Sequence, residues 1–498
     1  MINSFLTTKI RENFGFEPTS EQSEAISMMG DFLISRQGME LFLLRGYAGT
    51  GKTTLVGALV KTLVALKQPV VLMAPTGRAA KVFSAYAECP AYTIHKRIYR
   101  QKSLTDDTSF SLCPNLSKHT LFIVDEASMV ANDGLSSTTF GTGRLLDDLI
   151  QYVYSGEGCR LMLMGDTAQL PPVGEEESPA LSPSVLASYG LQVYEKTLTQ
   201  VMRQLSESGI LYCATRIREE LSSATEEYSS DATSLATSFL GDGEVKFPDV
   251  SHVRGDELIE SIESAYSRWG ADDCMIICRS NKRANIYNQG VRNRILYRED
   301  ELVTGDRIMI VKNNYYWIEK ELRALRAQDP SLAAQSISLP LSFIANGDIA
   351  IVRRVRRTRE MYGFRYADVL LRFPDYDDYE MEATVLLDTL YSESPSLTRE
   401  DSERLFANVM EDYAHISQKK ERYKQLREDP HFNALQIKFA YAVTCHKAQG
   451  GQWGAIYLDQ GYLPPETSVI DYYRWLYTAF TRATEQVYLV NWPKREKE

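Results

Sequence analysis

The sequence predicts an α/β protein made of two parallel-sheet domains. From residue 40 to about 200, apolar runs of strand length alternate with helical segments, and each run ends in a polar loop. A second alternation of this kind begins near Met275 and resumes after Phe439. Such alternation is typical of parallel sheets that bind ligands at the carboxyl ends of their strands. At 498 residues, the chain is also too long for one ordinary core.

The first domain is predicted to span residues 1–200. After a first strand that ends near residue 44, the expected strands are Val70–Ala74, Leu121–Val124 and Leu161–Met164. Residues 97–119 interrupt this pattern with a polar, turn-rich stretch flanked by basic residues. That stretch predicts an inserted β-hairpin.

The second domain is predicted to comprise residues 201–348 and 436–498. Its expected elements are the strands Met275–Cys278, Arg307–Val311, Ala455–Leu458 and Val487–Val490 and the helices over Arg283–Leu296 and Tyr472–Thr484. Between the two parts, residues 349–435 alternate like short antiparallel strands and then become a charged helical stretch. We therefore predict a small β-rich module inserted in the second domain.

Bulk composition narrows the class of protein. Apolar residues make up 44% of the chain, which is typical of a globular protein. No apolar run approaches the length of a membrane span, and the seven cysteines lack the spacing of a zinc site. We therefore expect a reduced cytoplasmic protein with no membrane partner.

The net charge of −11 argues against nucleic-acid binding at first sight, but basic residues cluster at 78–102, 279–298 and 353–359. Binding depends on local potential, although any one cluster also fits a solvated face.

The most specific motif lies at residues 46–53, which read G-x-x-x-x-G-K-T between an apolar run and a helix that starts at Lys52. This is the pattern of a phosphate loop that binds a nucleoside triphosphate. Its glycines let backbone N–H groups wrap the phosphates, and the helix N-terminus adds partial positive charge. Lys52 is predicted to reach the outer phosphates, and the Thr53 hydroxyl to ligate Mg²⁺. The predicted nucleotide contacts are Gly46, Ala48, Gly49, Thr50, Gly51, Lys52, Thr53 and Thr54.

Functional polar residues follow two further apolar strands. Asp125 and Glu126 come directly after Leu121–Val124. Asp125 is predicted to hold Mg²⁺, and Glu126 to orient and deprotonate the attacking water. An exposed acidic pair is the alternative, but the position after a buried strand disfavours it. Gln169 follows the strand Leu161–Met164, where its amide can sense the γ-phosphate by hydrogen bonding.

Further motifs complete an ordered set that runs from about residue 18 to 490. They are Pro18–Gln22, Ala74–Lys81, Thr93–Lys96, Leu198–Gln204, Val443–Gly450 and Tyr477–Ala483. In this order and with the phosphate loop, the set resembles superfamily 1 DNA helicases of the RecD and Dda type. A full set of ordered motifs is far more specific than a phosphate loop alone.

The resemblance implies two RecA-like domains, with a hairpin pin inserted in the first and an SH3-like module in the second. ATP and Mg²⁺ would then bind in a cleft between the two domains. Gln22 would read adenine, and Gln452 would contact the nucleotide at a position where relatives often carry an acidic residue. The catalytic residues implied are Lys52, Glu126, Gln169, Arg203 and Arg482.

The resemblance also implies a path for single-stranded DNA. Hydroxyl and cationic side chains of the motifs would hold phosphates without reading sequence. Phe110 would be the aromatic residue at the tip of the pin, and for His95 and His446 a buried hydrogen-bonding role stays open. The implied DNA-binding residues are Thr76, Arg78, Thr93, His95, Lys96, Phe110, Thr444, His446 and Lys447.

The predicted function is therefore an ATP-dependent DNA helicase that moves 5′ to 3′ on single strands and opens duplex junctions. Its polarity is implied by the resemblance alone. We expect a monomer that serves repair, recombination or replication, with single-strand-binding or repair proteins as partners. One alternative is an RNA-directed helicase of the same superfamily, because phosphate contacts do not discriminate sugars. Another is an ATPase subunit or scaffold of a nuclease complex that does not unwind on its own.

Overall fold

A computed structural model describes most of the chain, namely residues 2–35, 37–101, 110–133, 141–201, 208–223, 247–328, 339–341, 343–464 and 467–492. By its contacts, the chain divides into two compact units. The first unit contains Met1–His252, Ala448–Leu458 and Tyr462–Glu498, and the second contains Val253–Lys447 and Asp459–Gly461. C-terminal segments of the chain therefore belong to the same unit as the N-terminal sheet.

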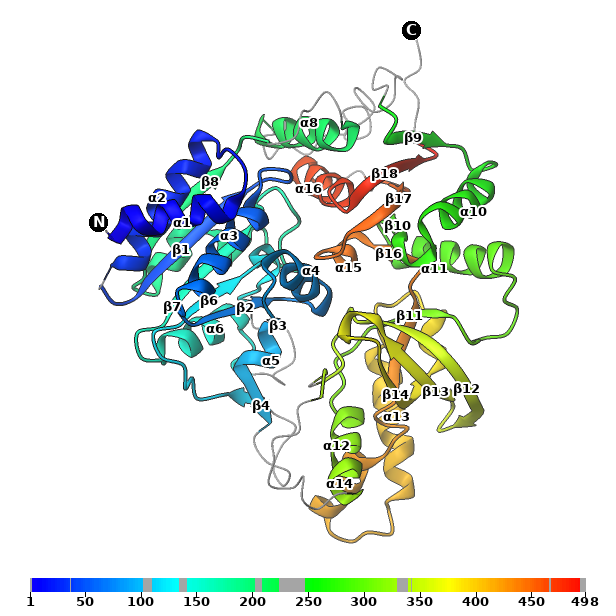
Figure 1. Cartoon of the computed structure of the whole chain (residues 1–498). Coiled ribbons are helices and arrows are strands. Elements are labelled where there is room, and N and C mark those ends of the chain that lie inside the picture. The colour runs from blue at the N-terminus through cyan, green and yellow to red at the C-terminus, as the bar shows by residue number, and fades with distance from the viewer. Residues whose placement is uncertain are drawn as a thin grey trace. The chain divides into compact units, whose positions relative to one another are not determined.

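The first unit contains a parallel sheet, as predicted (Figure 1). Its strands run in the order β3-β2-β6-β7-β1-β8, and every recorded pair is parallel. They are β1 (Glu40–Gly46), β2 (Val70–Ala74), β3 (Ala91–Thr93), β6 (Leu121–Val124), β7 (Arg160–Gly165) and β8 (Gln192–Leu198). Because all the strands point the same way, their carboxyl ends share one edge, where the predicted motif residues follow.

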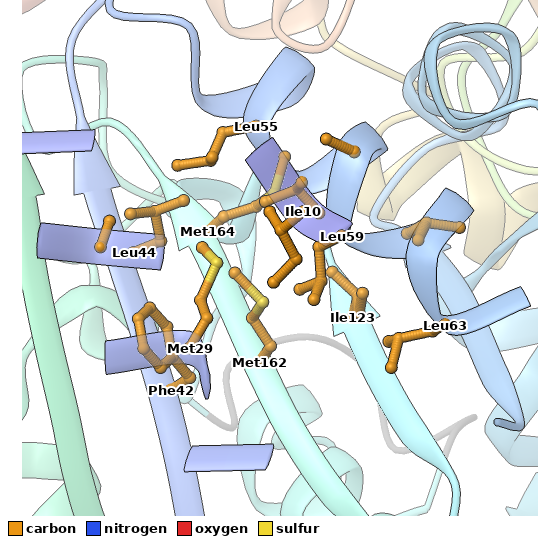
Figure 2. Packing of buried hydrophobic residues seen from close by; sticks show 14 of the residues in the cluster. Ile10, Met29, Phe42, Leu44, Leu55, Leu59, Leu63, Ile123, Met162 and Met164 are labelled. Carbon is orange, nitrogen blue, oxygen red and sulfur yellow. The ribbon is translucent and has the colours of Figure 1, made fainter. Parts of the chain in front are cut away.

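Helices cover both faces of this sheet, which explains why its strands read as continuous apolar runs. On β1, Phe42 and Leu44 join the core of one face, whereas Leu41 and Leu43 join the core of the other. Figure 2 shows the first of these cores, where Ile10, Met29 and Leu59 of three helices meet strand residues. The helices of that face are α1 (Ile2–Phe14), α2 (Ser20–Ile34), α3 (Lys52–Ala65) and α4 (Gly77–Ala87), and those of the other are α5 (Ile94–Ile98), α6 (Leu145–Tyr154) and α7 (Pro183–Ser188).

The hairpin predicted within the first domain is present. Strands β4 (Tyr99–Gln101) and β5 (Phe110–Leu112) pair antiparallel, with Tyr99 opposite Leu112. Residues 102–109, which connect the two strands in the sequence, and the side chain of Phe110 lie outside the described part of the chain.

A second sheet has the order β16-β10-β17-β18-β9, and its pairs β10–β16 and β17–β18 are parallel. Its strands are β9 (Val250–Val253), β10 (Cys274–Cys278), β16 (Ala442–Thr444), β17 (Trp453–Asp459) and β18 (Ala483–Val490). The accompanying helices are α8 (Gly209–Ser223), α10 (Leu258–Trp269), α11 (Asn281–Gly290), α15 (Cys445–Ala448) and α16 (Val469–Phe480). This sheet confirms the prediction of a second RecA-like domain.

The helix predicted over Tyr472–Thr484 ends earlier than expected. Helix α16 stops at Phe480, and Ala483 already pairs with Trp453 as the first residue of β18. Arg482 lies in the turn between them, where its backbone N–H donates to the carbonyl of Ala479. The predicted C-terminal boundary was wrong because strand pairing overrides the helical pattern of these last residues.

The β-rich insertion is a closed barrel of β11 (Arg307–Ile310), β12 (Ile349–Met361), β13 (Phe364–Phe373), β14 (Tyr379–Leu386) and β15 (Leu435–Phe439). Strand β11, which we expected in the α/β pattern, pairs with β12 and β15 of the barrel instead. Two helices pack on this barrel, α13 (Arg399–Asp412) and α14 (Lys419–Glu428). Leu405 of α13 and Leu426 of α14 join the hydrophobic cluster that contains Phe364 and Tyr366 of the barrel. Helix α12 (Tyr316–Gln328) follows β11 in the chain.

The basic run 353–359 lies on β12, and part of it is paired with acids of neighbouring strands. Arg353 contacts Glu380 at 3.1 Å, and Arg356 contacts Glu382 at 2.7 Å. Ion pairs of this exposed kind stabilise a fold only slightly. They favour the solvated-face interpretation for this cluster. In the described residues, no helix is long and apolar enough to cross a membrane.

A buried acid in the barrel predicts pH-dependent stability. Burial raises the pKa of Asp348 to about 7, against the hydrogen bonds donated by the Ala345 N–H and the Tyr376 hydroxyl. Between its unfolded value of 3.8 and about 7, the folded chain therefore holds a proton that the unfolded chain releases. The free energy of unfolding should fall as pH rises through this window.

We expect the wild type to lose on the order of 2 kcal/mol from about pH 5 to about pH 8 through this group. Asp348→Asn, which removes the titrating group, should show a smaller loss. Urea unfolding of both proteins at the two pH values measures the difference. An equal pH dependence in both proteins would contradict the assignment.

Candidate functional site

The phosphate loop connects β1 to α3. Gly49 and Gly51 adopt φ angles of 77° and 80°, in the left-handed region that favours glycine. A Cβ atom on Gly49 would also lie 2.9 Å from Leu211 of α8 and 3.1 Å from Val201. The Lys52 ammonium donates to the carbonyls of Gly46 and Tyr47, so it lies over the loop. The structure thus brings the predicted contacts from Gly46 to Thr54 together at the start of one helix.

The side-chain amide of Gln22 forms hydrogen bonds within the protein through both its oxygen and its nitrogen. It forms a capping box with Thr19 at the start of α2, and its Oε1 accepts from the Thr19 N–H at 3.0 Å. Its Nε2 donates to the carbonyl of Thr50 at 2.9 Å. In this structure, Gln22 therefore fixes the phosphate loop, and adenine reading by Gln22 stays a prediction.

The acidic pair lies at the end of β6, on the same sheet edge as the phosphate loop. Burial and the neighbouring Glu126 carboxylate raise the pKa of Asp125, while the charges of Lys52 and Arg482 oppose that rise. Glu126 has a φ of 51°, a strained conformation for a residue with a side chain and one that is common at functional sites. The pair is therefore held in a specific geometry rather than exposed as a loose charge.

Asp125 and Thr53 fit a magnesium site. Carboxylate and hydroxyl oxygens are hard ligands of the kind that Mg²⁺ prefers, and a cation would offset the burial of the Asp125 charge. The described residues contain no cluster of three or more His, Cys, Asp or Glu side chains suited to a metal. Mg²⁺ bound with substrate phosphates needs only one or two protein ligands.

Arg482 reaches the acidic pair from the turn after α16. Its side chain is 3% exposed, and its Nη1 lies 3.8 Å from Oε1 of Glu126. The guanidinium also donates to the carbonyls of Thr478 and Gly451, at 3.0 Å and 3.3 Å. These contacts lie within the first unit, because its C-terminal segments belong to it.

Tyr477 of α16 joins the phosphate loop to the end of β7. Its hydroxyl accepts from the Ala48 N–H at 2.8 Å and donates to Oδ2 of Asp166 at 2.7 Å. Sequence reasoning missed both residues as site members, although Tyr477 belongs to a quoted motif. Asp166 carried a usable signal, since it is an acid directly after an apolar strand.

Gln169 lies on the loop that Asp166 begins. Its side chain is buried, and its Oε1 has no hydrogen-bond partner among the described residues. A buried acceptor at this place suits the predicted hydrogen bonding around the γ-phosphate and its attacking water. The next residue, Leu170, donates to Thr478 Oγ1 and accepts from Gln449 Nε2, at 2.8 Å and 2.7 Å. Thr478 and Gln449 are further contacts that sequence reasoning missed.

The predicted catalytic Arg203 lies outside the described residues, which stop at Val201 and resume at Ser208. Val201 itself would be 3.1 Å from a Cβ atom on Gly49. The segment that leads to Arg203 therefore begins beside the phosphate loop.

Apart from Phe110 on β5, the DNA-contact residues predicted in the first unit lie at or just after the ends of β2 and β3. Thr76 caps α4 by accepting from the Ala79 N–H, and Thr93 caps α5 by accepting from the Lys96 N–H, each at 3.2 Å. Burial lowers the pKa of His95 to about 4, so its imidazole is neutral, and burial also lowers the pKa of Lys96. A neutral His95 fits the alternative given above, in which it is a buried hydrogen-bonding residue rather than a DNA contact.

Arg78 contacts the protein in a way that the sequence did not predict. Its guanidinium lies 4.1 Å from the centre of the Trp453 ring and donates to the carbonyl of Gln452 at 2.6 Å. The Gln452 side chain is exposed. DNA contact by Arg78 and nucleotide contact by Gln452 stay predictions. Close by, a Cβ atom on Gly450, whose φ is 72°, would lie 3.0 Å from Thr76 Oγ1.

A small pocket of the second unit has a mixed polar and apolar lining, whose polar residues are Thr444, Lys447, Lys438, Asn281, Asn285 and Asn288. Burial lowers the pKa of Lys447 to about 8. Burial and the charge of Lys447 lower the pKa of Lys438 to about 8 as well. Two lysine side chains that line one pocket suit an anion such as a phosphate. His446 is exposed on α15, next to this pocket in sequence.

Comparison with known proteins places these features in a family. A protein-family model described as an AAA domain matches residues 19–234, and one described as a UvrD-like helicase C-terminal domain matches residues 439–490. The ATP-dependent RecD2 DNA helicase of Deinococcus radiodurans is 32% identical over 36% of this chain and 21% of that protein. The ATP-dependent DNA helicase dda of Enterobacteria phage T4 is 24% identical over 54% of this chain and 55% of that protein. An uncharacterised protein of Acanthamoeba polyphaga mimivirus is 22% identical over 91% of this chain and 96% of that protein.

Solved structures of similar topology include Pif1 helicase from Bacteroides bound to single-stranded DNA, with 16% identity and a TM-score of 0.45. That likeness covers 95% of this chain and 92% of the Pif1 chain. The family-model and sequence matches confirm the resemblance that the motifs indicated. Together, these matches support a superfamily 1 helicase of the RecD and Dda type, a group of ATP-hydrolysing nucleic-acid helicases.

Proposed function

We propose that this chain is a DNA helicase that hydrolyses ATP to move 5′ to 3′ along single-stranded DNA and to open duplex junctions. The observation that carries the proposal is the convergence of the phosphate loop, Glu126 and Arg482 in one unit, with Arg482 3.8 Å from Glu126. DNA as the substrate is supported by the names of the RecD2 and dda relatives, which are DNA helicases.

The proposed chemistry assigns each group a separate task. Lys52 and the loop N–H groups hold the phosphates, and Glu126 orients and deprotonates the attacking water. Thr53 and Asp125 would hold Mg²⁺, which neutralises phosphate charge when bound. Arg482, together with Arg203, stabilises the charge that develops on the transferred phosphoryl group. In phosphoryl transfer, an added arginine is worth ~10³–10⁵ in rate.

DNA contacts are proposed for groups at the strand ends of both units. Thr76, Thr93 and Lys96 offer hydroxyl and ammonium donors in the first unit, and Thr444 and Lys447 do so in the second. Such donors position a backbone without reading its sequence, which suits a motor that moves over any sequence. We further propose that the hairpin within 97–119 acts as the pin, and that the module within 349–435 helps to hold the strand.

DNA and RNA are the substrates to distinguish first. We expect poly(dT) to stimulate ATP hydrolysis by the purified chain much more strongly than poly(U) of equal length. Each polymer is assayed over a concentration series, so that weak binding and weak stimulation are separated. Equal or stronger stimulation by poly(U) would favour the RNA-directed alternative, because sugar preference must come from contacts other than the phosphates.

A non-autonomous ATPase is the alternative of a different class. It would hydrolyse ATP in response to DNA but would not displace a strand without a partner protein. The complete set of ATP-site residues and the hairpin favour autonomous unwinding, which we propose serves repair, recombination or replication. Strand displacement by the chain alone separates the two.

A further inference from the structure

Tyr477 belongs to the motif Tyr477–Ala483, but that motif assigned a role only to Arg482. Tyr477 is 1% exposed, and its phenol lies between two loops that begin at neighbouring strands of the first sheet. The hydroxyl accepts from Ala48 of the phosphate loop and donates to Asp166 of the loop after β7. Both hydrogen bonds have the short, ordinary lengths of well-formed contacts, at 2.8 Å and 2.7 Å.

Asp166 is itself fixed by the loop that it begins. Its Oδ1 accepts from the Ala168 N–H at 3.0 Å, which leaves Oδ2 for the Tyr477 hydroxyl. Burial raises the pKa of Asp166, and the charge of Lys52 and the Tyr477 hydroxyl oppose that rise. Tyr477 is thus attached to the same loop that carries Gln169.

Helix α16 connects Tyr477 to Arg482 through hydrogen bonds at its C-terminal end. Thr478, the next residue, accepts from Leu170 of the Gln169 loop. The Arg482 Nε donates to the carbonyl of Thr478, and its backbone N–H donates to the carbonyl of Ala479. Because these bonds tie Arg482 to the end of α16, fixing α16 on the phosphate loop also fixes where the guanidinium lies.

We propose that Tyr477 is a positioning residue, whose hydroxyl holds α16 against the phosphate loop so that Arg482 reaches the reacting phosphates. This inference deepens the proposed ATPase function and rests on it. Arg482 supplies the charge, and Tyr477 sets the distance between that charge and the loop that binds the nucleotide. Small misplacements of a catalytic group cost large factors in rate, so a single hydroxyl can matter here.

Packing alone would explain the burial of Tyr477 but not its hydroxyl contacts. Phenylalanine fills nearly the same volume and would keep α16 packed, so Tyr477→Phe removes only the two hydrogen bonds. Tyr473 is the matched control, because it lies on the same helix and is also buried. Among the described residues, no hydrogen bond is recorded for its hydroxyl.

The test measures DNA-stimulated ATP hydrolysis in the full chain. Tyr477→Phe should lower kcat by about 10-fold while changing KM for ATP less than ~3-fold, since the nucleotide contacts of the loop remain. Tyr473→Phe should leave both constants unchanged. In an Arg482→Lys background, Tyr477→Phe should lower kcat by less than ~2-fold, because a residue that acts through Arg482 loses its effect once Arg482 is changed.

An unchanged kcat in Tyr477→Phe, or the same fold-loss in both backgrounds, would overturn the inference. So would a loss that appears only as a raised KM. The proposed function fails separately, if the wild type shows no stimulation by DNA. Thermal unfolding of each variant shows whether a lost kcat reflects lost folded protein instead, and a Tyr477→Phe loss that vanishes after correction for folded protein also counts against the inference.

Discussion

Lys52→Ala is expected to lower DNA-stimulated ATP turnover by at least ~10²-fold, because the variant loses the cation of the phosphate loop. The Lys52 ammonium lies over the loop, where it donates to the carbonyls of Gly46 and Tyr47. No other lysine or arginine among the described residues is recorded in hydrogen bonds to these carbonyls. Steady-state turnover across an ATP series measures the effect.

Lys61→Ala is the matched control for this variant. Lys61 lies on the same helix, α3, and pairs with Glu88 at 2.8 Å at the surface. A surface pair of this kind contributes little, so turnover and thermal stability should stay near those of the wild type. Near-normal turnover in Lys52→Ala would remove this loop from the active site.

Arg482→Ala is expected to lower kcat by ~10³-fold or more, which is the lower end of the range for an arginine in phosphoryl transfer. The residue is buried, lies 3.8 Å from Glu126 and is held by backbone carbonyls, so its charge is preorganised. Binding of an ATP analogue should change much less than turnover, because the loop itself is intact. Equilibrium binding and single-turnover hydrolysis measure the two effects separately.

Two further variants make the arginine result specific. Arg474→Ala changes another arginine of α16, one that donates to the carbonyl of Glu176 at 2.6 Å, and it should keep most of its activity. Arg482→Lys keeps the charge but not the planar guanidinium, so it should fall between the wild type and Arg482→Ala. A kcat for Arg482→Ala within tenfold of the wild type would mean that Arg482 is structural.

The sheets could be predicted because their strands are buried on both faces. Leu41–Leu44 is apolar throughout, since alternate residues enter two different cores. The placement of β11 could not be predicted in the same way. Arg307–Ile310 is a similarly short segment with three apolar residues after Arg307, and only its partners, β12 and β15, show that it belongs to the barrel.

In the candidate site, too, features formed by neighbouring residues could be predicted and contacts between distant residues could not. The phosphate loop could be predicted because its residues are consecutive and because the backbone of the loop itself requires glycine at Gly49 and Gly51. The capping role of Gln22 was also readable, because Thr19 and Gln22 stand three apart as a capping box requires. The Ala48–Tyr477 hydrogen bond joins residues 429 positions apart, so no local pattern predicts it.

Arg78 shows the same limit of local reasoning. Its position in a DNA-contacting motif predicts a phosphate contact, yet its guanidinium stacks on Trp453, which is distant in sequence. A cation placed over an aromatic ring depends on tertiary packing and leaves no signal in either segment alone.

Strand displacement by the purified chain tests the central claim most directly. Three labelled duplexes, with a 5′ single-stranded tail, a 3′ tail or no tail, are compared with ATP and with a non-hydrolysable analogue. We predict ATP-dependent displacement on the 5′-tailed duplex alone, which is lost in Lys52→Ala and retained in Lys61→Ala. Displacement that requires the 3′ tail, or no displacement on any duplex despite DNA-stimulated ATP hydrolysis, would contradict the account.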